Sequence, residues 1–275
     1  WNRMESSSNG IEWNHQMDSN GIIIECNRME STIRYEIIDE RQEGRNINVD
    51  FQGTLRENQM NAVSKMIQFD TGILSAATAF GKTVVCCDLI AEKGKNTLIL
   101  LESSSLINQW NDSIGKFLSI KEELPTYKTK TGIIKTRKSN VGILHGAKDT
   151  TTGIIDIAMV GTLYSKGNFH PRLQEYGMVL IDECHHAASE TIQRILCETK
   201  AKYVYGVTAT PIREDGLDKI NYMLIGPIRF RYSSKERAAE QGIEHLVYPR
   251  FTRVVFSRTQ KWILMKRINL LVMIA

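Results

Sequence analysis

The chain has 275 residues, of which 42% are hydrophobic, so it can bury one substantial core. Its formal net charge of +4 is too small to indicate a nucleic-acid partner by itself, and its five cysteines form no CxxC pair and indicate reduced thiols. Because no apolar run reaches the length of a membrane span and no secretion signal opens the chain, we expect a soluble, cytoplasmic protein with no membrane partner.

Residues 1–32 are repetitive. Asn-Arg-Met-Glu-Ser occurs at residues 2–6 and again at 27–31, but the copies keep neither a fixed period nor an apolar stripe, which excludes a solenoid. We predict a disordered segment, unrelated to the rest of the chain, that derives from translated tandem-repeat DNA. A binding arm is the alternative interpretation.

Residues 33–54 are predicted to form an N-terminal extension, with a short strand over Tyr35–Ile38 and a polar connector over Arg41–Asp50. From residue 55 onward, segments with helical spacing alternate with short apolar runs. We predict helices over 55–67, 82–93, 105–117 and 189–199, and strands over 73–76, 97–101, 141–144, 155–160, 178–182 and 203–208.

This alternation predicts an α/β fold, in which right-handed crossovers build a parallel sheet with helices on both faces. In such folds ligands bind beyond the carboxyl ends of the strands. The residues with the chemistry described next all lie at those predicted ends.

A phosphate-binding loop is predicted after the strand over 73–76. In Ala77–Thr83 a turn of small residues leads into Lys-Thr at the start of a helix, so backbone N–H groups can surround a phosphate. Lys82 would neutralise phosphate charge, and Thr83 would place its hydroxyl on Mg²⁺. Ala76 replaces the first glycine of the strict pattern, and Gly-Lys-Thr also arises by chance, so the loop alone does not establish a nucleotide site.

Two acids end the apolar run Val179–Ile181. Buried carboxylates are costly unless a cation compensates them, so we predict that Asp182 holds Mg²⁺ through water and that Glu183 orients or deprotonates an attacking water. A pair of surface acids at a strand end is the competing interpretation. We exclude zinc bound by Cys184 and the histidines after it, because adjacent side chains diverge and no fourth ligand follows at a recognisable spacing.

Three polar features are weaker. Thr208 and Thr210 follow a third apolar strand and could sense the nucleotide state through His185 or Glu183, although a Thr-rich turn before proline is the simpler interpretation. Gln59 could pair with adenine, or be a solvated helix residue. The basic, Thr-rich segment 121–138 is either a solvated loop, which we prefer, or a patch that contacts phosphates beside a nucleic-acid groove.

In this order, the segments resemble the first RecA-like domain of superfamily 2 DEAD/DEAH-type (DExH) helicases, in the subgroup close to restriction-enzyme and XPB-like helicases. The resemblance covers residues 33–256. The matching segments are Leu55–Gln59 (Q-type motif), Ala77–Thr83 (motif I), Leu100–Trp110 (motif Ia), Val160–Leu163 (motif Ib), Asp182–His185 (motif II) and Thr208–Thr210 (motif III).

The resemblance implies a single RecA-like P-loop NTPase domain with ATP and Mg²⁺ as cofactors and nucleic acid as partner. It implies that Asp182, Glu183 and Lys82 are catalytic, that Thr83 and Asp182 bind magnesium, and that His185, Thr208 and Thr210 couple nucleotide state to nucleic acid. It assigns ATP to Arg56, Gln59, Ala77, Thr78, Ala79, Phe80, Gly81, Lys82 and Thr83, and the phosphates of one strand to Ser103, Ser104, Gly161 and Thr162.

Two departures from the family pattern stand out. Glu102 occupies a position in motif Ia where relatives usually carry a basic residue. We also expect that 233–275 is a truncated linker and tail and that the second RecA-like domain is missing; whether 257–275 belong to the native gene is open. That domain supplies the family's arginine finger, which is typically worth about 10³ to 10⁵ in turnover, and whether another polypeptide supplies it in trans is open.

We therefore divide the chain into 1–32, 33–54, a RecA-like ATP-binding domain over 55–232, and 233–275. We expect the ATP-binding half of an ATP-dependent helicase or translocase that acts on single-stranded or duplex nucleic acid, with DNA favoured by the subgroup. The alternative is a catalytically silent fragment that binds nucleotide or nucleic acid. The order of the motifs disfavours a P-loop kinase or a transporter ATPase.

Overall fold

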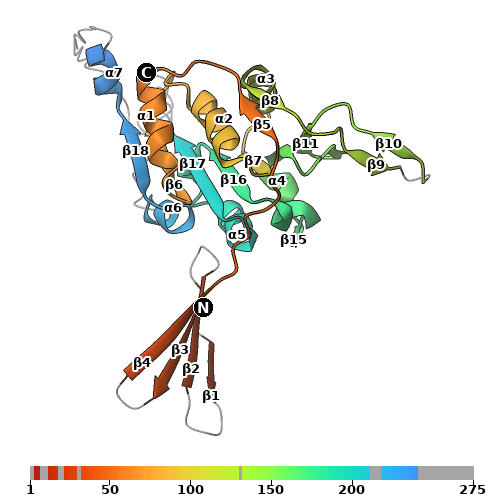
Figure 1. Ribbon diagram of the computed structural model, residues 1–275. Coiled ribbons are helices and arrows are strands. Elements are labelled where there is room, and N and C mark those ends of the chain that lie inside the picture. Colours follow the sequence, from red (N-terminus) through yellow and green to blue (C-terminus); the bar gives the residue numbers. More distant parts are fainter. Residues whose placement is uncertain are drawn as a thin grey trace, which may run out of the picture. The chain divides into compact units, whose positions relative to one another are not determined.

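A computed structural model describes residues 3–6, 12–17, 22–29, 32–129, 132–210 and 218–240 (Figure 1). The chain divides into two compact units, Trp1–Arg237 and Ala238–Ala275, and the description below concerns the first. Within the described residues its main sheet has eight strands. In spatial order they are β12 (Lys148–Asp149), β11 (Val141–His145), β13 (Ile155–Met159), β7 (Thr97–Leu101), β16 (Met178–Asp182), β17 (Tyr203–Thr208), β6 (Thr71–Ala76) and β18 (Ile228–Tyr232).

All neighbouring strands in this sheet are parallel except β12, which runs antiparallel to β11. The predicted parallel sheet is thus confirmed, with one antiparallel edge strand that we did not predict. β18, also not predicted, extends the sheet beyond β6.

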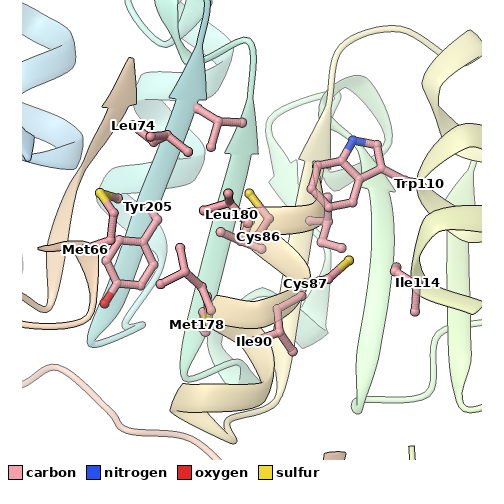
Figure 2. Packing of buried hydrophobic residues seen from close by; sticks show 14 of the residues in the cluster. Met66, Leu74, Cys86, Cys87, Ile90, Trp110, Ile114, Met178, Leu180 and Tyr205 are labelled. Atoms are coloured by element: carbon pink, nitrogen blue, oxygen red, sulfur yellow. The ribbon is translucent and has the colours of Figure 1, made fainter. Parts of the chain in front are cut away.

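Helices cover both faces of the sheet, as predicted. Successive side chains of a strand point to opposite faces, so Met178 and Leu180 of β16 join one hydrophobic cluster while Val179 and Ile181 join the other. The first cluster, part of which Figure 2 shows, includes side chains of α1 (Glu57–Met66), α2 (Lys82–Lys93) and α3 (Ser105–Phe117). The second includes side chains of α4 (Val160–Leu163), η1 (Pro171–Glu175), α5 (Glu190–Glu198) and α6 (Asp218–Ile225).

The start of the chain differs from our expectation of disorder. β1 (Arg3–Ser6), β2 (Glu12–Met17), β3 (Ile22–Met29) and β4 (Thr32–Asp39) pair in this order as an antiparallel sheet. Consecutive antiparallel strands need only short turns, and the isoleucine-rich runs of β3 and β4 favour extended backbone. The unrelated origin of residues 1–32 stays a prediction.

The segment predicted as a polar connector is part of the folded domain. β5 (Val49–Phe51) pairs with β8 (Leu118–Ile120), Gln42 bridges to Ala201, and the Ile47 side chain is buried. Two apolar residues, Ile47 and Val49, carry this packing, too few to stand out as a strand in the sequence.

Two segments that we predicted as a loop or left unassigned form short β-hairpins. β9 (Thr126–Lys128) pairs with β10 (Ile134–Thr136) inside the basic segment, and β14 (Tyr164–Ser165) pairs with β15 (Asn168–Phe169). The 3-10 turn η2 (Cys184–His186) and α7 (Ser234–Glu240) complete the described elements. Among the described residues, no helix has both the length and the apolar character needed to cross a bilayer.

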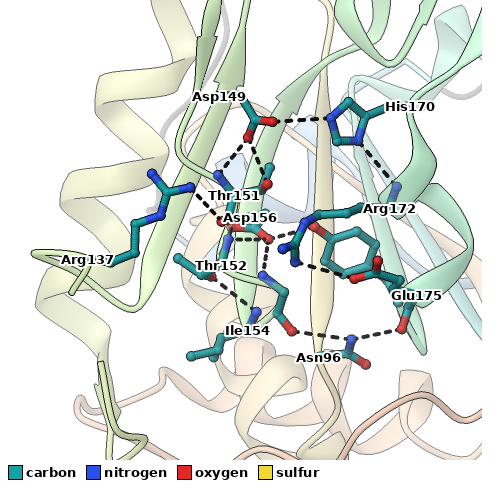
Figure 3. Close-up of polar contacts among 12 residues, drawn as sticks. Asn96, Arg137, Asp149, Thr151, Thr152, Ile154, Asp156, His170, Arg172 and Glu175 are labelled. Carbon is teal, nitrogen blue, oxygen red and sulfur yellow. Dashed lines mark hydrogen bonds and ion pairs between the residues drawn. The ribbon is translucent and has the colours of Figure 1, made fainter. Parts of the chain in front are cut away.

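A buried carboxylate orders the turn before β13 (Figure 3). Asp156 is inaccessible to solvent and accepts hydrogen bonds from the backbone N–H groups of Thr152 (2.8 Å) and Gly153 (2.7 Å) and from the Tyr176 hydroxyl (2.6 Å). Because a buried polar group without partners is costly, these donors fix the turn.

We predict that Tyr176→Phe destabilises the protein more than Tyr205→Phe does. Both rings are buried, but the Tyr176 hydroxyl donates to a carboxylate, whereas the Tyr205 hydroxyl donates to the backbone carbonyl of Phe69 (2.6 Å). Hydrogen bonds to charged groups are worth about 1.5–3 kcal/mol and neutral ones about 0.5–1.5 kcal/mol. Urea denaturation of both variants measures the difference, and an equal or reversed order would contradict this account.

Candidate functional site

Three strands deliver the predicted site residues to one edge of the sheet. β17 lies between β16 and β6 and is parallel to both, with Asp182 opposite Val207 and Thr208 opposite Ser75. Since parallel strands end at the same edge, the phosphate loop, the acid pair and Thr208 leave the sheet side by side. This is the convergence that the sequence predicted.

The phosphate loop has the backbone of an anion-binding turn. Phe80 N–H donates to the Ala77 carbonyl (3.1 Å), and Gly81 has φ +89° at the start of α2. A Cβ on Gly81 would lie 2.5 Å from Gln59 Nε2, so both the conformation and the space require glycine. The N–H groups of Val84 and Val85 donate to the Gly81 carbonyl (3.0 and 3.2 Å), and Gly81 has no side chain that could cap the N–H groups of Lys82 and Thr83, so these two are the donors that an anion could use.

Sequence analysis did not predict one strained position in this loop. Ala79 has φ +62°, a left-handed conformation that a residue with a Cβ adopts at a cost of about 1 kcal/mol or more. Strain of this kind persists only where surrounding contacts hold the backbone, and the loop has such contacts on two sides.

On one side, α1 holds the loop through Phe80. The carbonyl of Phe80 accepts hydrogen bonds from Gln59 Nε2 (2.8 Å) and from the Arg56 guanidinium, while Gln59 Oε1 accepts from the Arg56 backbone N–H (2.9 Å). In this structure both Q-motif side chains therefore support the loop. The predicted role of Gln59 in reading adenine stays a prediction.

On the other side, β18 and α7 hold the loop. Ala77 N–H donates to the Tyr232 carbonyl (3.0 Å), and Arg237 donates to the Thr78 carbonyl (2.6 Å). The Phe80 ring, 2% exposed, packs against the Tyr232 ring with centroids 4.9 Å apart. Sequence analysis missed these partners because they lie about 150 residues further along the chain, as the separation of 159 between Arg237 and Thr78 shows.

Asp182 is held by two donors. The Trp110 indole N–H donates to Oδ2 (2.8 Å), and the Glu183 backbone N–H donates to Oδ1 (2.9 Å). Burial raises the pKa of Asp182, and the neighbouring Glu183 raises it further, while the Trp110 hydrogen bond and the Lys82 charge oppose this rise. A bound cation would favour the ionised carboxylate for the same electrostatic reason that Lys82 does.

Glu183 has the opposite electrostatic setting. Its Oε2 lies 3.3 Å from His185 Nδ1, and this contact, followed by the charge of Lys82, lowers the pKa of Glu183 against the effect of burial. Glu183 also has φ +48°, so the backbone turns away from the direction of β16 directly after Asp182. Lys82 Nζ donates to the Ala76 carbonyl (3.4 Å) at the end of β6, and the charge of Lys82 acts to lower the pKa of both carboxylates.

The predicted coupling residues are in contact with the acid pair. His185 Nδ1 lies 3.0 Å from Thr208 Oγ1, which in turn accepts a hydrogen bond from Thr210 N–H (3.1 Å). A residue that sequence analysis missed, Asn221 of α6, donates to the His185 carbonyl (3.4 Å). These contacts link motif II to motif III, although their role in coupling stays a prediction.

The predicted nucleic-acid residues lie along the same edge, after β7 and β13. These two strands pair in parallel, and their last residues, Leu101 and Met159, lie opposite each other. Ser103 and Ser104 are exposed before α3, and Gly161 is exposed in α4 with open space around its Cα. Thr162 Oγ1 accepts a hydrogen bond from Gly146 N–H (3.0 Å), which ties α4 to the turn after β11. Their contact with nucleic acid stays a prediction.

We predict that Trp110→Phe raises the pKa of Asp182 further. The indole hydrogen bond stabilises the ionised carboxylate, so its loss favours the protonated form and enlarges the protonated fraction at any given pH. A pH titration of the Asp182 carboxyl signal by ¹³C NMR measures this. Tyr205→Phe, which removes a hydroxyl hydrogen bond elsewhere in the same cluster, is the control and should leave this pKa unchanged; a lower or unchanged value in Trp110→Phe would contradict the prediction.

Comparison with known proteins agrees with this geometry. A DNA 3'-5' translocase XPB2 from Sulfurisphaera tokodaii is 29% identical over 190 residues, which cover 68% of this chain and 37% of that protein. A putative helicase 109L from Invertebrate iridescent virus 3 is 29% identical over 193 residues, 68% of this chain and 55% of that protein. The chain thus spans about half or less of these relatives.

Among solved structures, the SWI2/SNF2 ATPase core of Sulfolobus solfataricus in complex with dsDNA aligns with a TM-score of 0.49 and 18% identity, over 74% of this chain and 43% of that one. The family described as "Type III restriction enzyme, res subunit" matches residues 52–213, more than half of the sequence. The chain therefore belongs to this family, and its described core is similar to the N-terminal RecA-like part of XPB-like superfamily 2 helicases.

Proposed function

We propose that this chain is the ATP-binding half of an ATP-dependent helicase or translocase that acts on DNA. The observation that carries the proposal is the convergence of Lys82, Asp182 and Glu183 at one sheet edge, beside a loop whose backbone suits a phosphate. Relatives named as DNA 3'-5' translocases or helicases support DNA as the polymer.

The residues of this edge fit ATP and Mg²⁺. The left-handed Gly81 turns the backbone into α2, and Lys82 with the first turn of α2 would hold the β- and γ-phosphates. Thr83 and Asp182 would hold magnesium with water and phosphate oxygens completing its shell, which agrees with the small number of protein ligands that this ion usually takes. When bound, the ion would neutralise charge on the phosphates.

Glu183 is the candidate general base. Its lowered pKa keeps the carboxylate ionised near neutral pH, so it can accept a proton from an attacking water. His185 fixes the orientation of this carboxylate and also touches Thr208, so a change at the γ-phosphate would reach motif III through one side chain.

We predict that Lys82→Ala lowers ATP affinity about 100-fold or more, because it removes the cation facing both the phosphates and the acid pair. Titration with a fluorescent ATP analogue measures this. Lys65→Ala, on the exposed surface of α1, is the matched control. Wild-type affinity in the Lys82 variant would refute the phosphate-loop assignment.

We also predict that single-stranded DNA stimulates ATP turnover of the full chain. Glu183→Gln should keep ATP binding and lower turnover about 10²-fold or more, the usual contribution of a general base. Steady-state phosphate release, with and without DNA, provides the measurement. ATP binding without turnover under both conditions would instead indicate a catalytically silent module.

A further inference from the structure

A surface cavity of about 460 Å³ lies where the β9–β10 hairpin meets the β11–β12 edge of the main sheet. Lys135, Arg137, Lys138 and Lys148 line it together with the Tyr127 ring, and its other lining residues are hydroxyl-bearing or apolar. The lining has no acidic side chain. Its chemistry is therefore that of an anion site.

These cations are not neutralised by the protein around them. Within the described part of the chain, none of the four forms an ion pair, and the three lysines are exposed. Four like charges around one cavity repel one another, and an anion that enters the cavity relieves this repulsion.

Arg137 is fixed in place before any ligand arrives. Its guanidinium stacks over the Tyr127 ring, 4.3 Å from the centroid, and donates to the Thr151 carbonyl (3.4 Å). Thr151 is itself held by Asp149 Oδ1, which accepts hydrogen bonds from its N–H (3.0 Å) and its hydroxyl (2.8 Å). Figure 3 shows this network, which continues from Asp149 to His170. A cation held this way loses less conformational entropy on binding.

The β12 side of the cavity, at Lys148, lies close in the chain to the turn that contacts Thr162 of the proposed nucleic-acid edge. β11 pairs with β13, and α4 with Thr162 follows β13. The turn between β11 and β12 donates from Gly146 to the Thr162 hydroxyl, and Lys148 begins β12 two residues later. A chain of phosphates that leaves Thr162 along this turn therefore meets Lys148 first and the hairpin cations next.

We propose that this cavity binds the phosphate backbone of a polynucleotide and extends the nucleic-acid track beyond motifs Ia and Ib. The proposal rests on the proposed function, because it requires nucleic acid on this domain. Separate cations on two neighbouring hairpins suit a polymer with a charge at every unit, and such contacts position the polymer without reading its sequence. The cavity supplies the phosphate contacts that Glu102 in motif Ia does not.

The test measures binding of the full chain to a fluorescent single-stranded oligonucleotide, a DNA duplex and an RNA duplex across a salt series. For Lys135→Ala/Lys138→Ala we expect roughly tenfold weaker binding at low salt. The negative slope of log affinity against log salt should become shallower by about 1.8, because two phosphate contacts are lost and each contributes about 0.9 for a duplex. A loss with DNA, RNA or both supports the site and identifies the polymer.

Two further variants separate charge from other effects. Lys135→Arg/Lys138→Arg keeps the charge and should keep the wild-type slope. Lys65→Ala/Lys219→Ala removes the same amount of charge from α1 and α6. These helices pack beside β6, six places from β12 in the strand order, so this variant should also keep the wild-type slope. All the replaced lysines are exposed, so folding should be unaffected, which thermal unfolding verifies.

The outcomes distinguish this proposal from the proposed function. If the wild type binds nucleic acid and the Lys135→Ala/Lys138→Ala variant matches the Lys65→Ala/Lys219→Ala control, the hairpin site is refuted while the helicase assignment stands. If the wild type binds no polynucleotide, both fail. A third outcome is that the Lys135→Ala/Lys138→Ala substitutions weaken the binding of a polyglutamate peptide but not of DNA or RNA. The occupant of the cavity is then an acidic protein segment, and the polynucleotide proposal is overturned.

Discussion

Parallel pairing of β17 with both β16 and β6 is the constraint on which the site depends. It brings Lys82, Asp182 and Glu183 together although about 100 positions separate the lysine from the acids in the sequence. Buried like charges repel strongly at low dielectric, and the Trp110 hydrogen bond to Asp182, the His185 contact with Glu183 and the charge of Lys82 offset this repulsion. The result is a raised pKa at Asp182 and a lowered pKa at Glu183, although the two carboxylates are adjacent in the sequence.

The phosphate loop is held from outside rather than by its own sequence. Gly81 adopts its left-handed conformation freely, but Ala79 does so at a cost. The surrounding structure offsets this cost through Phe80, whose carbonyl is held by α1 and whose ring is held by β18. The shape of the loop is therefore linked to α1, β18 and α7.

The sequence predicted the central strands, the long helices and the catalytic edge, because each has a strong local signal. Continuous apolar runs identified β7, β16 and β17, and strand-end polar residues located the site. The antiparallel edge strand β12, the hairpins and the packed segment around Ile47 have two to five residues each and no periodicity to detect. Trp110 and Asn221 were missed as site residues because their partners, Asp182 and His185, come from distant elements.

The residues proposed for the two ligands lie along one edge of the sheet. Those proposed for the nucleotide follow β6, β16 and β17, and those proposed for nucleic acid in motifs Ia and Ib follow β7 and β13. Motif II stands at the boundary, because His185 contacts Thr208 on one side while His186 Nδ1 lies 3.8 Å from Glu102 Oε2 on the other. Glu102, which follows β7, is thus linked to motif II, which follows β16, through one histidine side chain. Because these two segments are far apart in the sequence, only the parallel pairing of β7 with β16 brings this acid beside η2.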